Sequence, residues 1–417
     1  VYAGRVGTGF TEATLDDLAA RLAPLRRERS PFDRAPRLPR EAVFVEPRLV
    51  AEVEFREWTE DRVLRAPSFK GLRDDKPVTA VRSERRPTEP DPDSPEPEPS
   101  SPEPEPDPAS PEAALHAVER LPEGARAVTV EGKLVKVSNW DKVLFPQTGF
   151  TKGDLVTYYA RIAPVVLPHL HDRPLTLKRY PNGVEAQHFY EKQSPSHRPE
   201  WVQTARVGDV DYTLCQDRAT LVWLANLADI ELHTSLALAQ SPQRPTMLVF
   251  DLDPGPGAGI VECCEVGEVL HGLFGQLGLE SFAKTSGSKG LQVYVPLNVA
   301  VTYERTKPFA RQVAELLEQR MPELVVSRMT KRLRPGKVLV DWSQNDAHKT
   351  TVTVYSVRAR ERPTVSAPLS WEEVRRCRDS GEEGVLSFEV DQVLARSQDQ
   401  GDLFAPVLSL KQELPAT

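Results

Sequence analysis

The segment at residues 87–112, PTEPDPDSPEPEPSSPEPEPDPASPE, constrains the folding of this chain most. It contains nine acidic residues and no basic one, and prolines interrupt it throughout. Such a composition buries too little apolar surface to offset the entropy lost on ordering, and its like charges extend it. We therefore expect a disordered acidic linker at residues 83–124, between globular regions at residues 1–82 and 125–410. An acidic docking tail is the alternative.

This linker also explains the acidic balance of the chain. The 417 residues carry a formal net charge of −8, whereas everything outside residues 87–112 sums to +1. Basic surfaces that bind phosphates therefore remain possible. No apolar run of about 18 residues and no secretory signal is present, so we expect no membrane partner and a cytoplasmic protein. Four cysteines show neither zinc-ligand nor disulfide spacing.

The two globular regions have different patterns. In the first, LVAEVEFREWT (49–59) alternates like a half-buried strand and LDDLAARLAPL (15–25) like a short amphipathic helix, which predicts a small β-barrel with one helix. The second alternates helices and strands, which predicts a mixed α/β domain. Its expected helices are TKGDLVTYYARIAPVVLPHL, capped by Thr151, and PFARQVAELLEQRMP. Its expected strands are Thr246–Leu252, Leu291–Leu297 and Val338–Trp342.

Three acidic residues follow these apolar strands. Asp251 and Asp253 in MLVFDLDP are two positions apart, so their side chains leave a strand on the same face, roughly 6.5–7 Å apart. Asp341 ends the run KVLVD. Carboxylates that converge in this way bind hard divalent cations, and such sites catalyse phosphoryl transfer with two metals. A capped turn without a metal is the alternative for the first pair.

Between these acids, Ser286–Gly290 (SGSKG) forms a turn of small residues with one lysine. Backbone N–H groups in such a turn can bind phosphates, with the lysine as counter-charge. The spacing differs from a Walker A loop, and the turn precedes a strand. A plain hairpin turn is the alternative.

Taken in order, DLDP, SGSKGL-VYVPL and VDWSQN resemble the three motifs of the primase-polymerase domain of bacterial DNA ligase D. The resemblance extends over about residues 130–400 and includes SNWDKVLFPQTGF, RPLTLKRYPNGV and HFYEKQSP. It implies that Asp251, Asp253 and Asp341 bind two Mn²⁺ (or Mg²⁺) ions and catalyse addition of NTP or dNTP to a 3′-hydroxyl. It also implies DNA double-strand-break ends and gaps, and the Ku protein, as partners.

The same resemblance implies roles for further residues. Those near the nucleotide are His233, Ser286, Lys289, Gly290, Gln344, Lys349 and Arg358. A pocket for the DNA 5′-phosphate comprises Asn139, Lys142 and Lys152, and the template bases stack on Phe189 and Tyr190. Gln292 departs from the family, which has histidine there. Glutamine can donate and accept hydrogen bonds but carries no charge, so we expect impaired rather than absent activity.

The first region resembles the C-terminal OB-fold of ATP-dependent DNA ligases through VYAGRVGTGF and LRAPSFKGLRDDKP. In these ligases the positions of Arg73, Asp75 and Lys76 belong to a motif that closes over ATP. The nucleophile motif K-x-D-G is absent from this sequence. We therefore expect an upstream ligase nucleotidyltransferase domain as partner, and no nick sealing by this region alone.

The sequence thus predicts a nucleotidyltransferase of bacterial non-homologous end joining. One alternative is a catalytically impaired module that only bridges DNA ends by binding 5′-phosphorylated gaps. Another is a D-x-D phosphohydrolase, disfavoured because Pro254 and Gly255 follow Asp253 where such enzymes need a D-x-D-G-[TS] turn.

Overall fold

The computed structural model describes residues 2–32, 42–55, 57–58, 63–65, 67–73, 78, 81, 116–121 and 124–415. The chain divides into two compact units, one formed mainly by residues 1–110 and the other mainly by residues 111–417. Most of the expected linker, residues 83–115, lies outside the described residues.

The N-terminal unit combines one helix with short strand pairs. Helix α1 (Glu12–Leu22) begins after Thr11, which forms a capping box with Thr14, and a 3₁₀ turn (Ala23–Leu25) follows it. The described strands pair as β1 (Arg26–Arg27) with β2 (Phe44–Val45), β3 (Ala51–Glu54) with β6 (Ser68–Leu72), and β4 (Glu57–Trp58) with β5 (Leu64–Arg65). The single strand expected at residues 49–59 is therefore two strands, β3 and β4. A closed barrel is not formed by the residues that the structure describes in this unit.

The C-terminal unit begins earlier than expected. Strand β7 (His116–Arg120) pairs with β8 (Arg126–Val130), which pairs with β9 (Lys133–Val137), in a three-stranded antiparallel sheet. Residues 116–120 thus belong to a sheet although they fall within the range expected for the linker. They lie beyond the acidic repeat, and HAVER contains no proline that would interrupt a strand.

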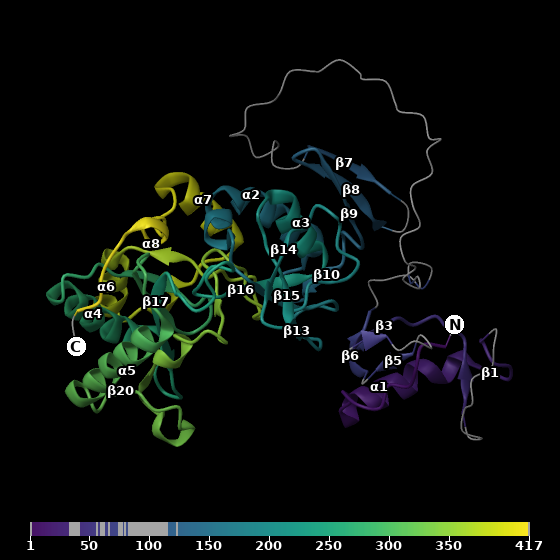
Figure 1. Ribbon diagram of the computed structural model, residues 1–417, viewed down its shortest axis with the longest axis horizontal. Coiled ribbons are helices and arrows are strands. Elements are labelled where there is room, and N and C mark those ends of the chain that lie inside the picture. The colour runs from purple at the N-terminus through teal and green to yellow at the C-terminus, as the bar shows by residue number, and fades with distance from the viewer. Residues whose placement is uncertain are drawn as a thin grey trace, which may run out of the picture. The chain divides into compact units, whose positions relative to one another are not determined.

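A four-stranded sheet forms the middle of this unit, in the order β13 (Phe189–Glu191), β12 (Leu175–Arg179), β16 (Asp229–Thr234), β22 (Thr351–Val352). Helix α2 (Lys152–Leu170) packs on α3 (Arg218–Asn226) beside it (Figure 1). Thr151 caps α2 through a capping box with Asp154, as predicted, and the expected apolar face is buried. Two hairpins lie nearby, β10 (Val143–Phe145) with β11 (Phe150–Thr151), and β14 (Thr204–Val207) with β15 (Val210–Thr213).

A six-stranded sheet carries the predicted motifs. Its order is β20 (Val325–Val326), β21 (Val338–Asp341), β17 (Met247–Pro254), β19 (Leu291–Pro296), β18 (Phe282–Thr285), β23 (Pro368–Leu369). All pairs are antiparallel except β20 with β21. The three strands predicted from sequence are confirmed as β17, β19 and β21. Helices α4 (Ile260–Gln276), α5 (Tyr303–Arg320) and α6 (Trp371–Ser380) gather around this sheet (Figure 1).

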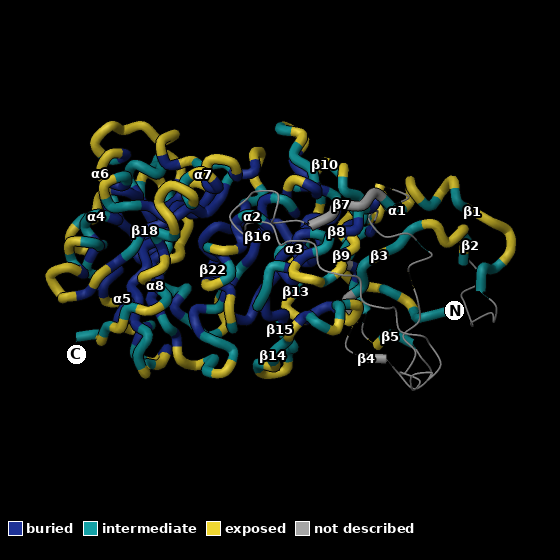
Figure 2. Tube along the Cα trace, turned by 90° about the horizontal axis from the view of Figure 1, so that it is seen from above, coloured by how far each residue is buried: buried dark blue, intermediate teal, exposed yellow. Residues whose placement is uncertain are grey.

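Two buried cores occupy the C-terminal unit, one around α2, α3 and the four-stranded sheet, the other between the six-stranded sheet and α4 and α5. Buried residues concentrate in this unit (Figure 2). The remaining helices, α7 (Val390–Gln400) and α8 (Pro406–Ser409), follow β23. Within the described part of the chain, no helix has the length and apolar character needed to cross a bilayer.

Candidate active site

Alternation along β17 places two acids on one face. Leu248, Phe250 and Leu252 pack into the core with α4 and α5. Met247 and Val249, on the opposite face of β17, belong to the core around α2, α3 and the four-stranded sheet. Asp251 and Asp253 lie on the same face as Met247 and Val249, because side chains two positions apart in a strand point the same way. The strand therefore delivers both carboxylates to the space between the two sheets.

Asp341 joins them through strand pairing. It is the last residue of β21 and lies directly opposite Asp251 on the neighbouring strand. Residues opposite each other in antiparallel strands have Cβ atoms about 4.5–5.5 Å apart. On its other side Asp251 lies opposite Gln292 of β19, which in turn lies opposite Lys284 of β18. Asp341, Asp251, Gln292 and Lys284 thus form one row across the sheet. The structure thus brings together the three acids that the sequence predicts, although residue 341 is remote in sequence.

The electrostatics of the pair indicate a missing counter-charge. Burial, then the neighbouring carboxylates of Asp253 and Asp341, raise the pKa of Asp251 to about 7. Burial and Asp341 also raise the pKa of Asp253. Asp251 Oδ1 is buried and has no hydrogen-bond partner among the described residues. An unpartnered carboxylate oxygen between like charges suits a divalent cation, which would satisfy the oxygen and neutralise the charge.

Asp341 is engaged by its own turn. Its Oδ1 accepts hydrogen bonds from the Ser343 backbone N–H (2.8 Å) and Oγ (2.7 Å), and its Oδ2 accepts one from Gln344 Nε2 (2.8 Å). Correspondingly, no group of three His, Cys, Asp or Glu side chains is arranged to hold a metal ion anywhere in the described part of the chain. Asp251 and Asp253 fit a cation in their present conformation. Asp341 must first give up one of its hydrogen bonds to Ser343 or Gln344 before it can bind the same cation.

The predicted phosphate loop connects β18 to β19 beside the acids. Ser286 Oγ accepts hydrogen bonds from the N–H groups of Ser288 (3.2 Å) and Gly290 (3.1 Å), and Thr285 Oγ1 accepts one from Gly287 (3.2 Å). These N–H groups are therefore already engaged within the loop, unlike the outward-facing donors that the sequence suggested. Glycine is required at position 290, because a Cβ there would lie 2.2 Å from the Leu252 carbonyl oxygen. That close approach holds the loop against β17.

A cavity of ~390 Å³ opens where acids and loop meet. Six of the expected nucleotide-binding residues line it together with two of the acids: His233, Asp251, Asp253, Ser286, Lys289, Gly290, Gln292 and Arg358. Gln344 also lines it, whereas Lys349 does not and is exposed. Arg334 and Arg360 line it as well, and the sequence analysis missed both. Arg360 could have been found from its i+2 spacing to Arg358; Arg334 sits in a long loop whose course no local pattern reveals.

Gln292 has a defined place in this wall. Its side chain forms a hydrogen bond with Asp251 that lowers the pKa of that carboxyl, and its Oε1 accepts a hydrogen bond from Tyr294 Oη (3.4 Å). Tyr294 Oη also forms a hydrogen bond with Thr351 Oγ1 (3.1 Å), in which the threonine hydroxyl can donate. The residue that departs from the expected histidine therefore helps to orient the first acid.

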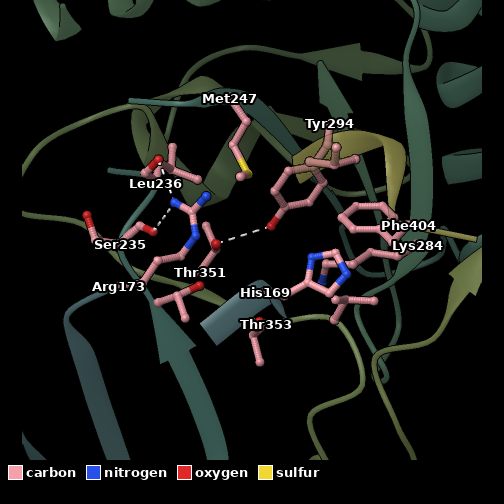
Figure 3. A pocket seen from close by; sticks show the side chains of 13 residues that line it. His169, Arg173, Ser235, Leu236, Met247, Lys284, Tyr294, Thr351, Thr353 and Phe404 are labelled. Carbon is pink, nitrogen blue, oxygen red and sulfur yellow. Dashed lines mark hydrogen bonds between the residues drawn. The ribbon is translucent and has the colours of Figure 1, made fainter. Parts of the chain in front are cut away.

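Two buried basic side chains, Arg173 and Lys284, line a second and smaller cavity. A small cavity of ~20 Å³, room for about one water molecule, is lined by Arg173, Lys284, Tyr294 and Thr351 among others (Figure 3). Arg173 donates to the carbonyl oxygens of Ser235 (3.3 Å) and Leu236 (2.9 Å), and burial lowers its pKa to about 10. Lys284 Nζ donates to Ser366 Oγ (2.6 Å), and burial lowers its pKa well below the usual value.

The three residues expected to bind a DNA 5′-phosphate are neighbours at the start of α2. Lys142 N–H donates to the Asn139 carbonyl (3.0 Å), and Lys152 N–H donates to the Lys142 carbonyl (2.8 Å). Lys142 Nζ contacts Asn182 Oδ1 (2.9 Å). Lys152 is wholly buried, with Nζ donating to Ser138 Oγ (3.4 Å), so it is not the solvated surface lysine that its sequence context alone suggests.

The expected template platform lies on β13. Tyr190 is 58% exposed, its ring centroid is 6.2 Å from that of His233, and Lys178 Nζ lies 5.6 Å from the same centroid. Phe189 precedes it and is half-buried. In the N-terminal unit, Arg73 is buried and pairs with Glu52 (2.5 Å). Asp75 and Lys76 of the same predicted motif lie outside the described residues.

The chain matches two protein-family models. Residues 151–404 match the primase-polymerase domain of LigD, and residues 1–76 match the C-terminal region of ATP-dependent DNA ligases. Over 67% of the chain and 99% of the other protein, the fold is similar to a polymerase domain from Mycobacterium tuberculosis ligase D solved in complex with DNA, with a TM-score of 0.62 and 41% identity.

Curated relatives share this similarity. A multifunctional non-homologous end joining protein LigD from Mycolicibacterium smegmatis is 43% identical over 279 residues, which is 66% of this chain and 36% of that protein. A protein of the same description from Pseudomonas aeruginosa is 33% identical over 379 residues, 89% of this chain and 42% of that protein. The chain thus spans well under half the length of these relatives.

Proposed function

The chain belongs to the LigD primase-polymerase family, and from this premise we propose that it adds nucleotides to the 3′-hydroxyl ends of broken DNA during bacterial non-homologous end joining. The family is a family of nucleotidyltransferases. The substrates that we propose are NTPs and dNTPs, together with double-strand-break ends and short gaps. The metal dependence, the nucleotide contacts and the DNA contacts below are parts of this proposal.

One observation carries the proposal most directly. Asp251 and Asp341 face each other on paired strands, Asp253 follows on the same face of β17, and the loop with Lys289 borders the same cavity. Phosphoryl transfer needs anionic ligands for cations and positive charge for the phosphates at adjacent positions. This cavity offers both within one wall.

Asp251, Asp253 and Asp341 would hold two divalent cations, Mn²⁺ or Mg²⁺, which when bound supply the activation of the attacking 3′-hydroxyl and the charge neutralisation of the leaving pyrophosphate. The remaining residues position the triphosphate. Lys289 lines the cavity from the loop, and His233 and Arg358 line it as well, with Arg358 donating to the carbonyl oxygen of Ser286 in the same loop. Gln292 keeps the Asp251 carboxylate oriented through its hydrogen bond.

On the DNA side, we propose that Asn139, Lys142 and Lys152 bind the 5′-phosphate across a gap. The exposed ring of Tyr190, with Phe189, would carry the template bases, because stacking tolerates any base sequence. We also propose Ku and an upstream ligase nucleotidyltransferase domain as partners. In that arrangement residues 1–76 would serve nick sealing only together with the upstream domain, which would supply the nucleophilic lysine.

Primer extension on DNA with a short 5′-phosphorylated gap tests the proposal. The protein with Mn²⁺ and a nucleoside triphosphate is expected to lengthen the primer, and removal of divalent cations by a chelator is expected to abolish the product, because the site would lose its counter-charge. Re-addition of Mn²⁺ after the chelator serves as control and should restore the product. Extension that persists in the chelator would contradict the metal-dependent mechanism.

The alternative is a module that bridges DNA ends and incorporates nothing, and the presence of Gln292 instead of histidine motivates it. The Gln292→His variant separates the two. An imidazole can still donate to Asp251 and adds positive charge when protonated, so we expect a several-fold gain in incorporation, about threefold to tenfold. A wild-type protein that binds gapped DNA but incorporates nothing, with no gain in the variant, would support the bridging module.

A further inference from the structure

Glu231 occupies an unusual position on β16. Its side chain is only 2% exposed, and it faces the cavity wall rather than the core, since Ile230 and Leu232 alternate with it into the core. Burying a carboxylate without partners costs free energy, so a buried carboxylate needs hydrogen-bond donors or cations around it. Its partners are basic side chains and one backbone N–H group, and two of these residues, His233 and Arg358, line the nucleotide cavity.

Three basic side chains converge on this carboxylate. His233 Nε2 lies 3.0 Å from Oε2, Lys178 Nζ lies 3.4 Å from Oε2, and Arg358 Nε lies 3.4 Å from Oε1. The backbone N–H of Ala359 also donates to Oε1 (3.1 Å). Each of the three basic side chains is 13–14% exposed.

Strand pairing makes this convergence possible. Lys178 on β12 lies directly opposite Glu231 on β16, and His233 is two positions further on the same face. Arg358 comes from the loop after β22, and the Ala359 contact fixes that loop next to the strand. Burial alone would raise the pKa of Glu231, but the hydrogen bond from His233 and the charge of Arg358 hold it below its usual range. The carboxylate is therefore anionic. It faces two cations, Lys178 and Arg358, and the imidazole of His233, whose pKa is lowered by burial.

We infer that Glu231 is a positioning residue of the nucleotide site: together with Lys178, it holds His233 and Arg358 so that these two face the triphosphate. Without an anion between them the charges of Lys178 and Arg358 would repel each other, and His233 would lose its hydrogen-bond partner, so the three side chains would take other rotamers. Glu231 contacts the cations from behind, while His233 and Arg358 line the cavity. The nucleotide then meets a preformed cationic wall, and less free energy is spent on ordering it. This inference rests on the proposed function, because it assigns the wall to a triphosphate.

The Glu231→Gln variant tests it, since glutamine keeps the size and loses the charge. We expect the KM for the nucleoside triphosphate to rise about tenfold or more and kcat to change less than about threefold, because the wall contributes to binding before and during reaction alike. The Kd for 5′-phosphorylated gapped DNA, measured without nucleotide, should stay within about twofold of wild type, since Asn139 and Lys142 do not contact Glu231. A general loss of folding would instead weaken nucleotide binding and DNA binding together.

Glu373→Gln provides a matched control. Glu373 is also a partly buried carboxylate paired with an arginine, accepting from Arg396 Nη1 (2.6 Å) and Nη2 (3.0 Å), but it lies on α6 and outside the cavity lining. Its loss should lower thermal stability and leave the nucleotide KM unchanged. Circular dichroism of both variants checks that they fold.

A double-mutant cycle covers the case in which Glu231→Gln is itself destabilised. If Glu231 acts through its partners, its substitution should have little further effect on nucleotide KM when His233 and Arg358 are already alanine. Two results would overturn this inference alone, provided that the wild-type protein extends primers. One is a wild-type nucleotide KM in Glu231→Gln; the other is an effect of Glu231→Gln on KM that adds fully to that of the partner substitutions. A wild type that neither binds nor incorporates nucleotide would overturn the proposed function as well.

Discussion

Replacing Asp251 with alanine is expected to reduce nucleotide incorporation by on the order of 10³-fold or more. Asp251 is the acid that faces both other members of the triad, through its pairing with Asp341 and its place beside Asp253 on β17. Its loss removes a carboxylate from the cation site, and metal-ion stabilisation of developing charge is worth several kcal/mol, or about tenfold in rate for each 1.4 kcal/mol. Single-turnover primer extension measures this loss.

Asp346→Ala is the matched control for that substitution. Asp346 lies five residues after Asp341, but its carboxylate pairs with Lys307 (2.5 Å) and accepts from the His348 N–H (2.9 Å), outside the cavity. Its removal should leave incorporation within a few-fold of wild type. The Asp251→Ala protein should still bind gapped DNA, since Lys142 and Asn139 are untouched. Extension at a wild-type rate by Asp251→Ala would refute the role of the triad.

The metal-free protein is expected to become less stable as the pH rises from about 4 to about 8. The pKa of Asp251 is about 7 in the folded protein and 3.8 in its unperturbed state, so the folded protein binds the proton more tightly. Stability from this group is complete below the unfolded pKa and is lost as the pH rises through 7. Asp253, whose pKa is also raised, acts in the same direction. We expect a loss of about 4 kcal/mol from the Asp251 group between pH 4 and pH 8, since a pKa shift of one unit corresponds to about 1.4 kcal/mol.

Urea denaturation of the chelator-treated protein at pH 5 and pH 8 measures this effect. Asp251→Asn should abolish most of the difference, because asparagine does not titrate, and should stabilise the metal-free protein at pH 8. Addition of Mn²⁺ should stabilise the wild type more at pH 8 than at pH 5, since the ion replaces the missing proton. A metal-free wild type that is more stable at pH 8, with no change in Asp251→Asn, would contradict this view of the buried acid.

The parts of the site that follow from local periodicity could be predicted. The apolar runs that became β17, β19 and β21, and the capped helix α2, are visible in sequence because their side chains alternate or repeat at the expected spacing. Asp251 and Asp253 share a face for the same local reason. That Asp341 lies directly opposite Asp251 depends on strand register, which no local pattern gives. The acid at the end of KVLVD and the family resemblance predicted only that the three carboxylates meet.

Features set by long-range packing escaped prediction. Glu231 could have been noticed as the i−2 neighbour of His233 on one strand face, but its pairing with Lys178 and Arg358 needs β12 and a distant loop. Lys152 is buried at the first turn of α2 because neighbouring segments cover it, which composition cannot show. The sheet strand at residues 116–120 was included in the linker because only the acidic repeat before it has a distinctive composition.

The location of bound cations tests the central claim most directly. Crystals of the protein grown with Mn²⁺ and a non-hydrolysable nucleoside triphosphate would be measured at the manganese absorption edge. We predict an anomalous peak at bonding distance from the carboxylates of Asp251 and Asp253, with the triphosphate between that peak and Lys289. Manganese bound elsewhere, with nucleotide in the cavity and these two carboxylates free of metal, would contradict the account.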